Sequence, residues 1–314
     1  MRTYIGEKMM SFIDCMKNRS SILMEGALGE RLKREYHLVL DESVTMAGLV
    51  YSEKGRKALK ELWSEYAKIA GTYHLPFLAT TPTRRTNQER IERSRFDSTI
   101  IQENVRFLRE VQALQNVEMY SGGLVGCKGD AFTGESALDL KSSKDFHEWE
   151  VRLFAEAGVD FLYAALFPNV EETAGMALAI EKYKLPYIIS FTIKRDGCLI
   201  DGTRISDAIK YIDSLTTDKP VCYMTNCVHP GVLNEALLQP FNNNEIIHKR
   251  FKGIQVNTSA LSYAELDNSK DLKTAEPTEL AIDTVKLREI SPLQIFGGCC
   301  GTDGRHMNEI AKRI

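Results

Sequence analysis

Short apolar runs rich in β-branched and aromatic residues alternate with amphipathic segments of helical period along nearly the whole chain. The apolar runs predict strands at residues 22–24, 77–80, 119–122, 161–164, 187–191, 221–227, 253–256 and 294–296. The amphipathic segments predict helices at residues 53–70, 90–114, 143–157, 170–183, 204–215 and 303–313. Eight strand-then-helix units favour a closed parallel barrel over an open sheet. We therefore predict the α/β class and a single (β/α)8 TIM barrel.

The chain shows no low-complexity linker, charge block or shift in composition that would mark a domain boundary. Its 314 residues are 43% hydrophobic, which is enough to build a large core. Length alone would suggest two domains, but α/β barrels commonly reach this size as one. The prediction is one barrel domain over residues 1–314.

The net charge and the absence of targeting signals limit the classes of partner and the compartment that we expect. The formal net charge of −3 gives no basis for binding nucleic acid or an anionic membrane. The N-terminus lacks an unbroken apolar signal-peptide core, and no later stretch reaches the length of a transmembrane helix. Seven cysteines are an odd number and too sparse for a disulfide scaffold, which favours a reducing compartment. We expect a cytoplasmic protein.

Three of the seven cysteines are placed for metal chemistry. Cys227 closes the sixth predicted strand, while Cys299 and Cys300 follow a glycine pair at the end of the eighth. The carboxyl ends of barrel strands form the rim where reacting groups gather. Adjacent residues on a regular strand face opposite ways, so we expect Gly297, Gly298 and Gly301 to supply the backbone freedom that lets both cysteines reach one ion.

Three thiolates with a vacant fourth position are the arrangement of a catalytic zinc, so Zn²⁺ is the predicted cofactor. A substrate thiol entering the fourth position would lose its proton and become a reactive thiolate near neutral pH. The other reading, buried core cysteines, is preferred for Cys15, Cys127, Cys198 and Cys222.

Several motifs together resemble the homocysteine S-methyltransferase family of zinc-dependent thiol methyltransferases. They include the terminal run with the two cysteines, Asn226-Cys227, and further stretches spread along the chain: Glu25-Gly26-Ala27-Leu28-Gly29, Thr80-Thr81, Ser190-Phe191-Thr192, Asp196-Gly197, Gly202-Thr203, Asn257 and His306. The resemblance implies a (β/α)8 barrel, zinc held by Cys227, Cys299 and Cys300, and homocysteine as the thiol. We expect Glu25 to bind an acceptor ammonium, with the backbone at Gly26 and Ala27 and the side chain of Thr80 also at the substrate. Asn226 and Asn257, at strand ends on the same rim, either hydrogen-bond the substrate or tie loops together.

The departures from the family pattern concern the amino group of the acceptor. The family usually has Asp-Gly-Gly where this chain has Glu25-Gly26-Ala27, which keeps a carboxylate on a longer arm. After the fourth strand the family usually has a glutamate, and here Ala165 stands in that region. A buried ammonium without its partner is costly, so the acceptor is left open between homocysteine and another thiol.

The loop after the second strand carries Arg84 and Arg85 where some relatives have aromatic residues. Arginine cannot hold a quaternary ammonium by cation–π attraction, but it clamps a carboxylate or phosphate. One hypothesis is that betaine is not the donor and that Arg84 or Arg85 meets an anionic group. The alternative is that both are solvated charges. His229 is expected to orient a loop or a substrate group and is a weaker candidate for a fourth ligand. His306 is either a support for a metal-bound cysteine or a surface histidine.

The leading interpretation is a zinc-dependent methyltransferase that moves a methyl group from a small donor to a metal-bound thiol, in methionine biosynthesis if the acceptor is homocysteine. No cobalamin or folate module follows the barrel, so a large methyl carrier would come free or on a separate protein. The alternatives are a zinc-dependent demethylase or lyase on the same scaffold, and a non-enzymatic redox or metal sensor based on Cys299 and Cys300. The donor and the oligomeric state are open.

Overall fold

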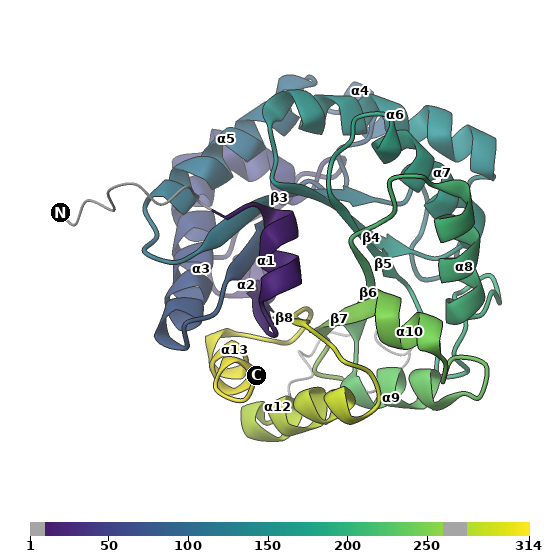
Figure 1. Cartoon of the computed structure of the whole chain (residues 1–314). Helices are drawn as coiled ribbons and strands as arrows, with labels where there is room; N and C mark the ends of the chain where they lie inside the picture. The colour runs from purple at the N-terminus through teal and green to yellow at the C-terminus, as the bar shows by residue number, and fades with distance from the viewer. Residues whose placement is uncertain (1–9, 260–274) are drawn as a thin grey trace.

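The computed structural model describes residues 10–259 and 275–314. Eight parallel strands pair in chain order, and β1 pairs with β8, so the sheet closes into a barrel. Figure 1 looks along the barrel, with the strands in the middle and the helices around them. The strands are β1 (Ile22–Met24), β2 (Phe77–Thr80), β3 (Met119–Gly126), β4 (Phe161–Phe167), β5 (Tyr187–Phe191), β6 (Cys222–Val228), β7 (Phe251–Val256) and β8 (Ile295–Gly298). The predicted (β/α)8 fold is confirmed.

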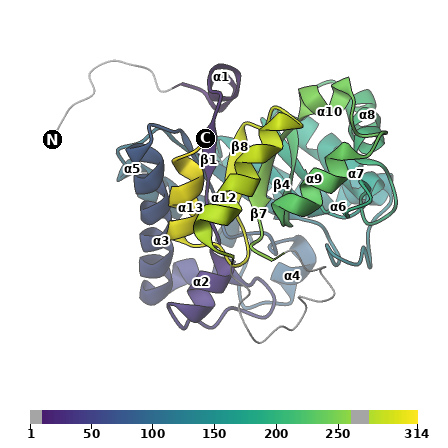
Figure 2. The same cartoon turned by 90° about the horizontal axis from the view of Figure 1, so that it is seen from below.

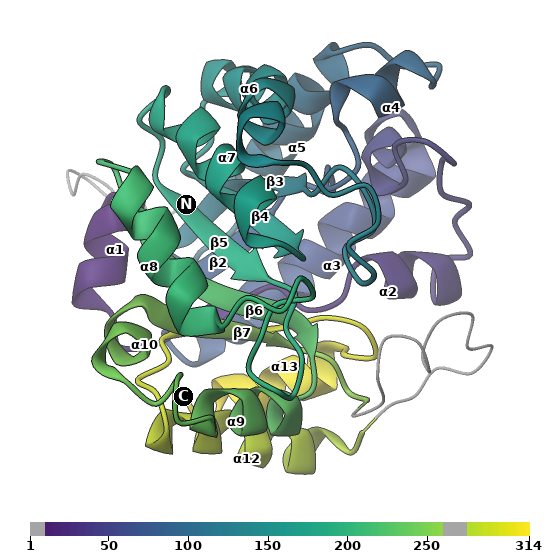
Figure 3. The same cartoon turned by 90° about the vertical axis from the view of Figure 1, so that its right-hand side faces the viewer.

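Helices cover the outside of the barrel, as Figure 3 shows for α7 and α8 outside β4 and β5. They are α1 (Phe12–Asn18), α2 (Gly29–Arg34), α3 (Glu53–Thr72), α4 (Gln88–Glu92), α5 (Thr99–Ala113), α6 (Leu140–Ala157), α7 (Val170–Glu181), α8 (Ile205–Leu215), α9 (Pro230–Leu238), α10 (Glu245–Arg250), α12 (Pro277–Lys286) and α13 (Gly304–Ala311). Two 3₁₀ turns, Met46–Tyr51 and Leu287–Glu289, complete the elements. Among the described residues, no helix is long and apolar enough to cross a membrane.

Two apolar clusters reflect the alternation of side chains along each strand. One fills the space between strands and helices. The other fills the barrel interior and includes Met24, Phe161 and Met224. Helix α1, which the sequence analysis did not predict, adds Phe12 and Cys15 to this inner cluster. It lies across the end of the barrel where the strands begin, opposite α2 and α4 (Figure 2).

Several sequence predictions of element boundaries were wrong, and two of them have a clear physical reason. The single helix expected at residues 90–114 is two helices, because Ser94 donates its hydroxyl to the Ile91 carbonyl and Asp97 accepts the amide of Thr99. Strand β3 runs four residues further than predicted, through Gly122 and Gly123. A Cβ on Gly122 would lie 2.5 Å from the Phe161 ring, so glycine is required there by packing.

Candidate active site

The three predicted metal ligands meet at the carboxyl-terminal end of the barrel. The Sγ atoms of Cys227, Cys299 and Cys300 all lie within 4.8 Å of one another. Cys227 Sγ is 3.6 Å from Cys300 Sγ, and Cys299 Sγ is 4.0 Å from Cys300 Sγ. Cys227 is buried, Cys299 is partly buried and Cys300 is exposed, so the cluster can be reached from solvent. The geometry suits a metal ion with access from outside.

The backbone brings the adjacent cysteines together differently from what we expected. Positive φ angles occur at Gly301 (83°) and at Cys227 itself (59°), while Gly297 and Gly298 have none. A Cβ on Gly298 would lie 2.3 Å from Thr302 Oγ1, so this glycine serves close packing. The left-handed conformation of Cys227 costs about 1–3 kcal/mol, which is the kind of strain found at functional sites.

Hydrogen bonds link the cysteines to one another and to the rim. The side-chain amide of Asn257 donates to Cys227 Sγ at 3.7 Å. Hydrogen bonds from Cys227 and Cys299 hold the pKa of the Cys300 thiol well below its usual range, and the nearby cations Arg84 and Lys33 act in the same direction. Hydrogen bonding with Cys227 and Cys300 raises the pKa of Cys299. Of the three thiols, Cys300 is thus the one whose ionised form the cluster favours.

Glu25 lies at the same end of the barrel, but its carboxylate is held by protein groups. Its oxygens accept hydrogen bonds from Trp63 Nε1 at 2.8 Å, and from the Thr80 amide and hydroxyl. Trp63 belongs to α3 in the outer helix layer. Burial raises the pKa of Glu25 to about 7, although these hydrogen bonds oppose the shift. Glu25 and Thr80, both predicted to bind substrate, thus bind each other.

The other predicted residues of the first strand are also engaged internally. The Ala27 amide donates to Thr302 Oγ1 at 3.1 Å, and the Ala27 carbonyl accepts the Tyr66 hydroxyl at 2.8 Å. Gly26 lies under the Tyr66 ring, where a Cβ would come within 2.7 Å of a ring carbon. In this structure Gly26 and Ala27 therefore fix the loop after β1 against α3.

Asn226 also bonds a protein group. Its Oδ1 accepts the Ser190 hydroxyl at 2.6 Å, and the residue adjoins Cys227. Sequence reasoning missed a buried polar pair that includes its register partner on β7: the Tyr163 hydroxyl donates to Gln255 Oε1 at 2.9 Å. Gln255 is the next-to-last residue of β7, and its position at a strand end was the available signal.

The two histidines have structural roles. Nδ1 of His229 accepts the Gly231 amide at 3.1 Å and caps α9, so this nitrogen is not free to bind metal. His306 forms a capping box with Asp303 at the start of α13, and its Nε2 lies 3.0 Å from the Ala275 carbonyl. It is fully buried, which contradicts the expected surface histidine. Its two ring nitrogens bond Asp303 and Ala275, so it does not support a cysteine either.

Arg84 and Arg85 follow β2 at the same rim. Arg85 donates to the Gly129 carbonyl at 2.9 Å, which is a backbone contact and does not neutralise its charge. The guanidinium of Arg84 makes no hydrogen bond or ion pair within residues 10–259 and 275–314, and it contributes to the low pKa of the Cys300 thiol. Ala165, at the position of the missing glutamate, is a buried member of the inner core.

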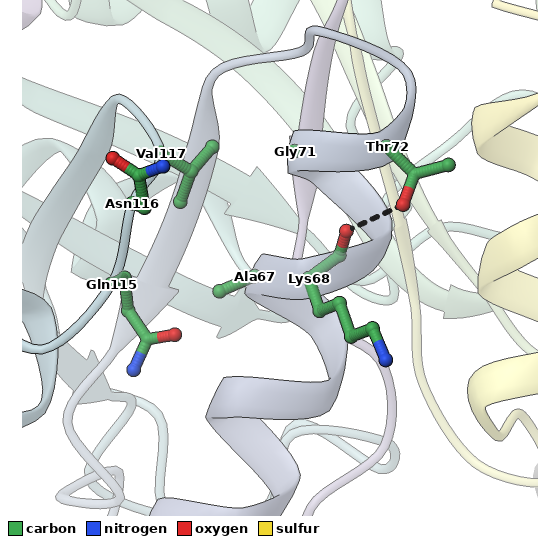
Figure 4. Close-up of a pocket in the computed structure, with 7 residues that line it drawn as sticks. All are labelled: Ala67, Lys68, Gly71, Thr72, Gln115, Asn116 and Val117. Atoms are coloured by element: carbon green, nitrogen blue, oxygen red, sulfur yellow. Dashed lines mark hydrogen bonds between the residues drawn. The ribbon is translucent and has the colours of Figure 1, made fainter.

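A hollow lies at the opposite end of the barrel from the cysteines, near the end of α3 and the start of β3 (Figure 4). It has a volume of about 380 Å³ and is lined by Ala67, Lys68, Gly71, Thr72, Gln115, Asn116 and Val117. The Thr72 hydroxyl donates to the Lys68 carbonyl within it. Its lining contains no cysteine, histidine or carboxylate, so it offers no catalytic group comparable to the cysteine cluster.

The chain is similar in sequence to two plant methyltransferases. Homocysteine S-methyltransferase 2 of Arabidopsis thaliana is 24% identical over 214 residues, which cover 67% of this chain and 62% of the plant protein. Selenocysteine Se-methyltransferase of Brassica oleracea var. italica is 23% identical over 224 residues, covering 70% of this chain and 62% of that protein. The matched segments thus span about three fifths of these relatives.

Solved structures show the same fold. The oxidized form of the homocysteine methyltransferase MmuM from Escherichia coli superposes with a TM-score of 0.76 at 18% identity, covering 95% of this chain and 98% of MmuM. Its metallated form gives a TM-score of 0.73 at 17% identity over the same shares. A sequence model described as Homocysteine S-methyltransferase matches residues 22–314. This chain therefore belongs to the homocysteine S-methyltransferase family.

Proposed function

We propose that this protein is a zinc-dependent methyltransferase that transfers a methyl group from a small-molecule donor to a thiol such as homocysteine. The observation that carries the proposal is the cluster of three sulfur atoms at the catalytic rim of the barrel. Tetrahedral zinc with Zn–S bonds of about 2.3 Å needs sulfurs about 3.8 Å apart, which agrees with the separations of 3.6 and 4.0 Å. Family membership and the metallated relative support the same function.

The cluster leaves a place for the acceptor. No fourth cysteine, histidine or carboxylate joins the three sulfurs within the described residues. When bound, zinc would act as a Lewis acid that favours the thiolate form of the acceptor near neutral pH. Asn257 orients Cys227 through its hydrogen bond to Sγ. The other residues of the rim would hold the methyl donor and the acceptor thiol in line. Such positioning can account for much of the rate enhancement without a general base.

Zinc content and methyl transfer in two serine variants test the proposal. Cys300→Ser replaces a predicted ligand, whereas Cys198→Ser replaces a partly exposed cysteine outside the cluster. Wild-type protein and Cys198→Ser should hold about one zinc per chain, and mass spectrometry should detect methionine formed from homocysteine and S-methylmethionine. Cys300→Ser should lose zinc affinity and activity by at least about 100-fold, because removing a ligand costs more than disturbing a residue behind one. Full activity after complete zinc removal would refute the proposal.

A further inference from the structure

The side chain of Gln255 bridges the place where the barrel closes. Its neighbours Ile254 and Val256 belong to the cluster between strands and helices, so Gln255 points into the barrel. Its Nε2 donates to the Glu25 carbonyl at 3.3 Å and to the Gly298 carbonyl at 3.5 Å. Gln255 therefore joins three strands: β7, on which it lies, β8, which ends at Gly298, and β1, which ends just before Glu25.

The first residue of the glycine pair before the two cysteines leaves room for this bridge. Gly297 on β8 is the register partner of Gln255. A Cβ on Gly297 would lie 2.8 Å from Gln255 Cγ and 3.1 Å from the Glu25 carbonyl oxygen. Because Gly297 has no positive φ, its backbone conformation does not require glycine. The residue is glycine because the stem of Gln255 passes over it.

Tyr163 fixes the orientation of the Gln255 amide. The Tyr163 hydroxyl donates to Gln255 Oε1 at 2.9 Å. Burial raises the pKa of Tyr163 well above its ordinary value, so the hydroxyl keeps its proton and can donate. The two carbonyl oxygens on the other side of the amide can only accept, so the amide nitrogen must face them. The contact with Tyr163 thus favours the one orientation in which Gln255 bridges the strands.

The residues that follow Gln255 hold the two adjacent cysteines through their backbone. The Val256 carbonyl accepts the Cys299 amide at 2.7 Å, and the Thr258 amide donates to the Cys300 carbonyl at 3.2 Å. The end of β7 is therefore attached to β8 at each residue from which a predicted metal ligand extends.

The third cysteine is attached to the same segment. The Asn257 side chain donates to Cys227 Sγ at 3.7 Å, and the Asn257 amide donates to the Val228 carbonyl at 2.9 Å. The end of β7 thus contacts both parts of the cysteine cluster. Its position relative to β8 determines how far the sulfur of Cys227 lies from those of Cys299 and Cys300.

We propose that Gln255 is a positioning residue of the metal site. It holds the end of β8 against β7 and β1, so that Cys299 and Cys300 stay within metal-binding distance of Cys227. The inference rests on the proposed function, since the three cysteines must hold the metal. Zinc–sulfur bonds of about 2.3 Å leave little tolerance in the separation of the sulfurs, so a shift of β8 would weaken metal binding.

Zinc affinity, measured by competition with a chelator, tests this assignment. Gln255→Met keeps the length of the side chain and removes its polar atoms, and it should weaken zinc binding by about 10- to 100-fold. Tyr163→Phe keeps the amide but removes the contact that orients it, and it should weaken zinc binding by about fivefold.

Gln294→Met is the matched control. Gln294 lies just before β8 at the opposite end of the barrel, and its side-chain amide also donates to two carbonyls, those of Met16 and Arg19. Because distant sites act independently, Gln294→Met should leave zinc affinity within about twofold of the wild-type value.

A spectroscopic measurement distinguishes positioning from a general loss of stability. Urea denaturation of metal-free protein gives the loss of stability in each variant, and we expect a loss in both glutamine variants. The visible absorption of Co²⁺-loaded protein reports the geometry of the thiolate ligands. It should change in Gln255→Met and stay that of wild type in Gln294→Met.

Two results would overturn the inference while leaving the proposed function intact. One is wild-type zinc affinity in Gln255→Met or, if that variant does not fold, in Tyr163→Phe. The other is an equal loss of zinc affinity in Gln255→Met and Gln294→Met, which would show that any loss of stability has the same effect. If the wild-type protein binds no zinc, the proposed function fails and the inference fails with it.

Discussion

The two ends of the barrel differ in how well their side chains and backbone are satisfied by the protein itself. At the end where strands begin, α1 closes the interior, and Phe12 stacks on Phe161 with ring centroids 4.5 Å apart. At the end where strands finish, Cys227 and Leu166 have positive φ angles, and they are the two such non-glycine residues that lie within named strands. Thr192, directly after β5, has a buried hydroxyl without a hydrogen-bond partner among residues 10–259 and 275–314.

This difference indicates that one end of the barrel contributes mainly to stability and the other to ligand binding. Well-packed aromatic rings contribute to folding and need no ligand, whereas strained backbone and unpaired polar atoms lower stability unless a ligand uses them. One other buried side-chain atom of the described residues lacks a partner, Asn104 Oδ1 on α5. The cysteines, Glu25 and Arg84 all lie at the second end. Changes at the first end should therefore alter stability alone, and changes at the second should alter ligand binding as well.

The largest effect on stability is expected from Phe12→Ala. Removing a buried ring from the closed end should lower the free energy of unfolding by about 3–5 kcal/mol, measured by urea denaturation. Zinc content of the folded variant should stay at the wild-type value, because the cysteines lie at the opposite end. Exposed Ile13 on the same helix provides the control: Ile13→Ala should change stability by less than about 0.5 kcal/mol. A Phe12→Ala protein that folds but cannot hold zinc would contradict the conclusion that changes at this end alter stability alone.

A smaller effect concerns Glu25 and the pH dependence of stability. Its pKa is about 7 in the folded protein, against 4.5 as the ordinary value. The folded state therefore holds more protons between these pH values, so this contribution is fully present below pH 4.5 and lost as pH rises through 7. The shift corresponds to about 3 kcal/mol.

Glu25→Gln should remove that decline. Urea titrations of metal-free, reduced protein at several pH values between 4.5 and 8 would give the free energy of unfolding for both proteins. The difference between wild type and variant isolates Glu25, because the other titrating groups are common to both. Parallel curves for the two proteins would show that Glu25 is not the source of the decline.

The smallest effect is expected from Thr192→Val. The substitution removes the unpaired buried hydroxyl at nearly constant shape and should raise the free energy of unfolding of metal-free protein by about 1 kcal/mol. If the hydroxyl meets substrate, the same variant should bind the acceptor less tightly. A loss of stability in metal-free protein would mean that the hydroxyl has a partner within the folded chain.

The sequence predicted the repeated architecture better than its local exceptions. Eight apolar runs with amphipathic segments between them were sufficient for the barrel, because each unit repeats the same pattern. The break before α5 depends on side-chain contacts of Ser94 and Asp97 with the backbone, which helical periodicity does not reveal. Helix α1 becomes recognisable only when the interior that receives Phe12 is known.

Some features of the site could be predicted from the sequence, and others could not. The cysteine cluster could be predicted because Cys299, Cys300 and Cys227 stand at strand ends, and strand ends meet at one rim. The contacts of Glu25 could not, because its partner Trp63 lies on α3 in the outer layer. The role of His306 depends on the capping geometry of Asp303, and sequence spacing alone did not distinguish it from a histidine near the metal.

The order of the strands has a consequence for the order of assembly. Cys299 and Cys300 reach Cys227 once β8 has paired with β7 and β7 with β6, whereas the Gly298 amide bonds to the Glu25 carbonyl at 3.0 Å only when β8 also closes against β1. Both steps join distant parts of the chain and should be late, because closing a long loop costs entropy. Acquisition of zinc during refolding would thus report the pairing of the last three strands, and it should trail the appearance of helical circular dichroism.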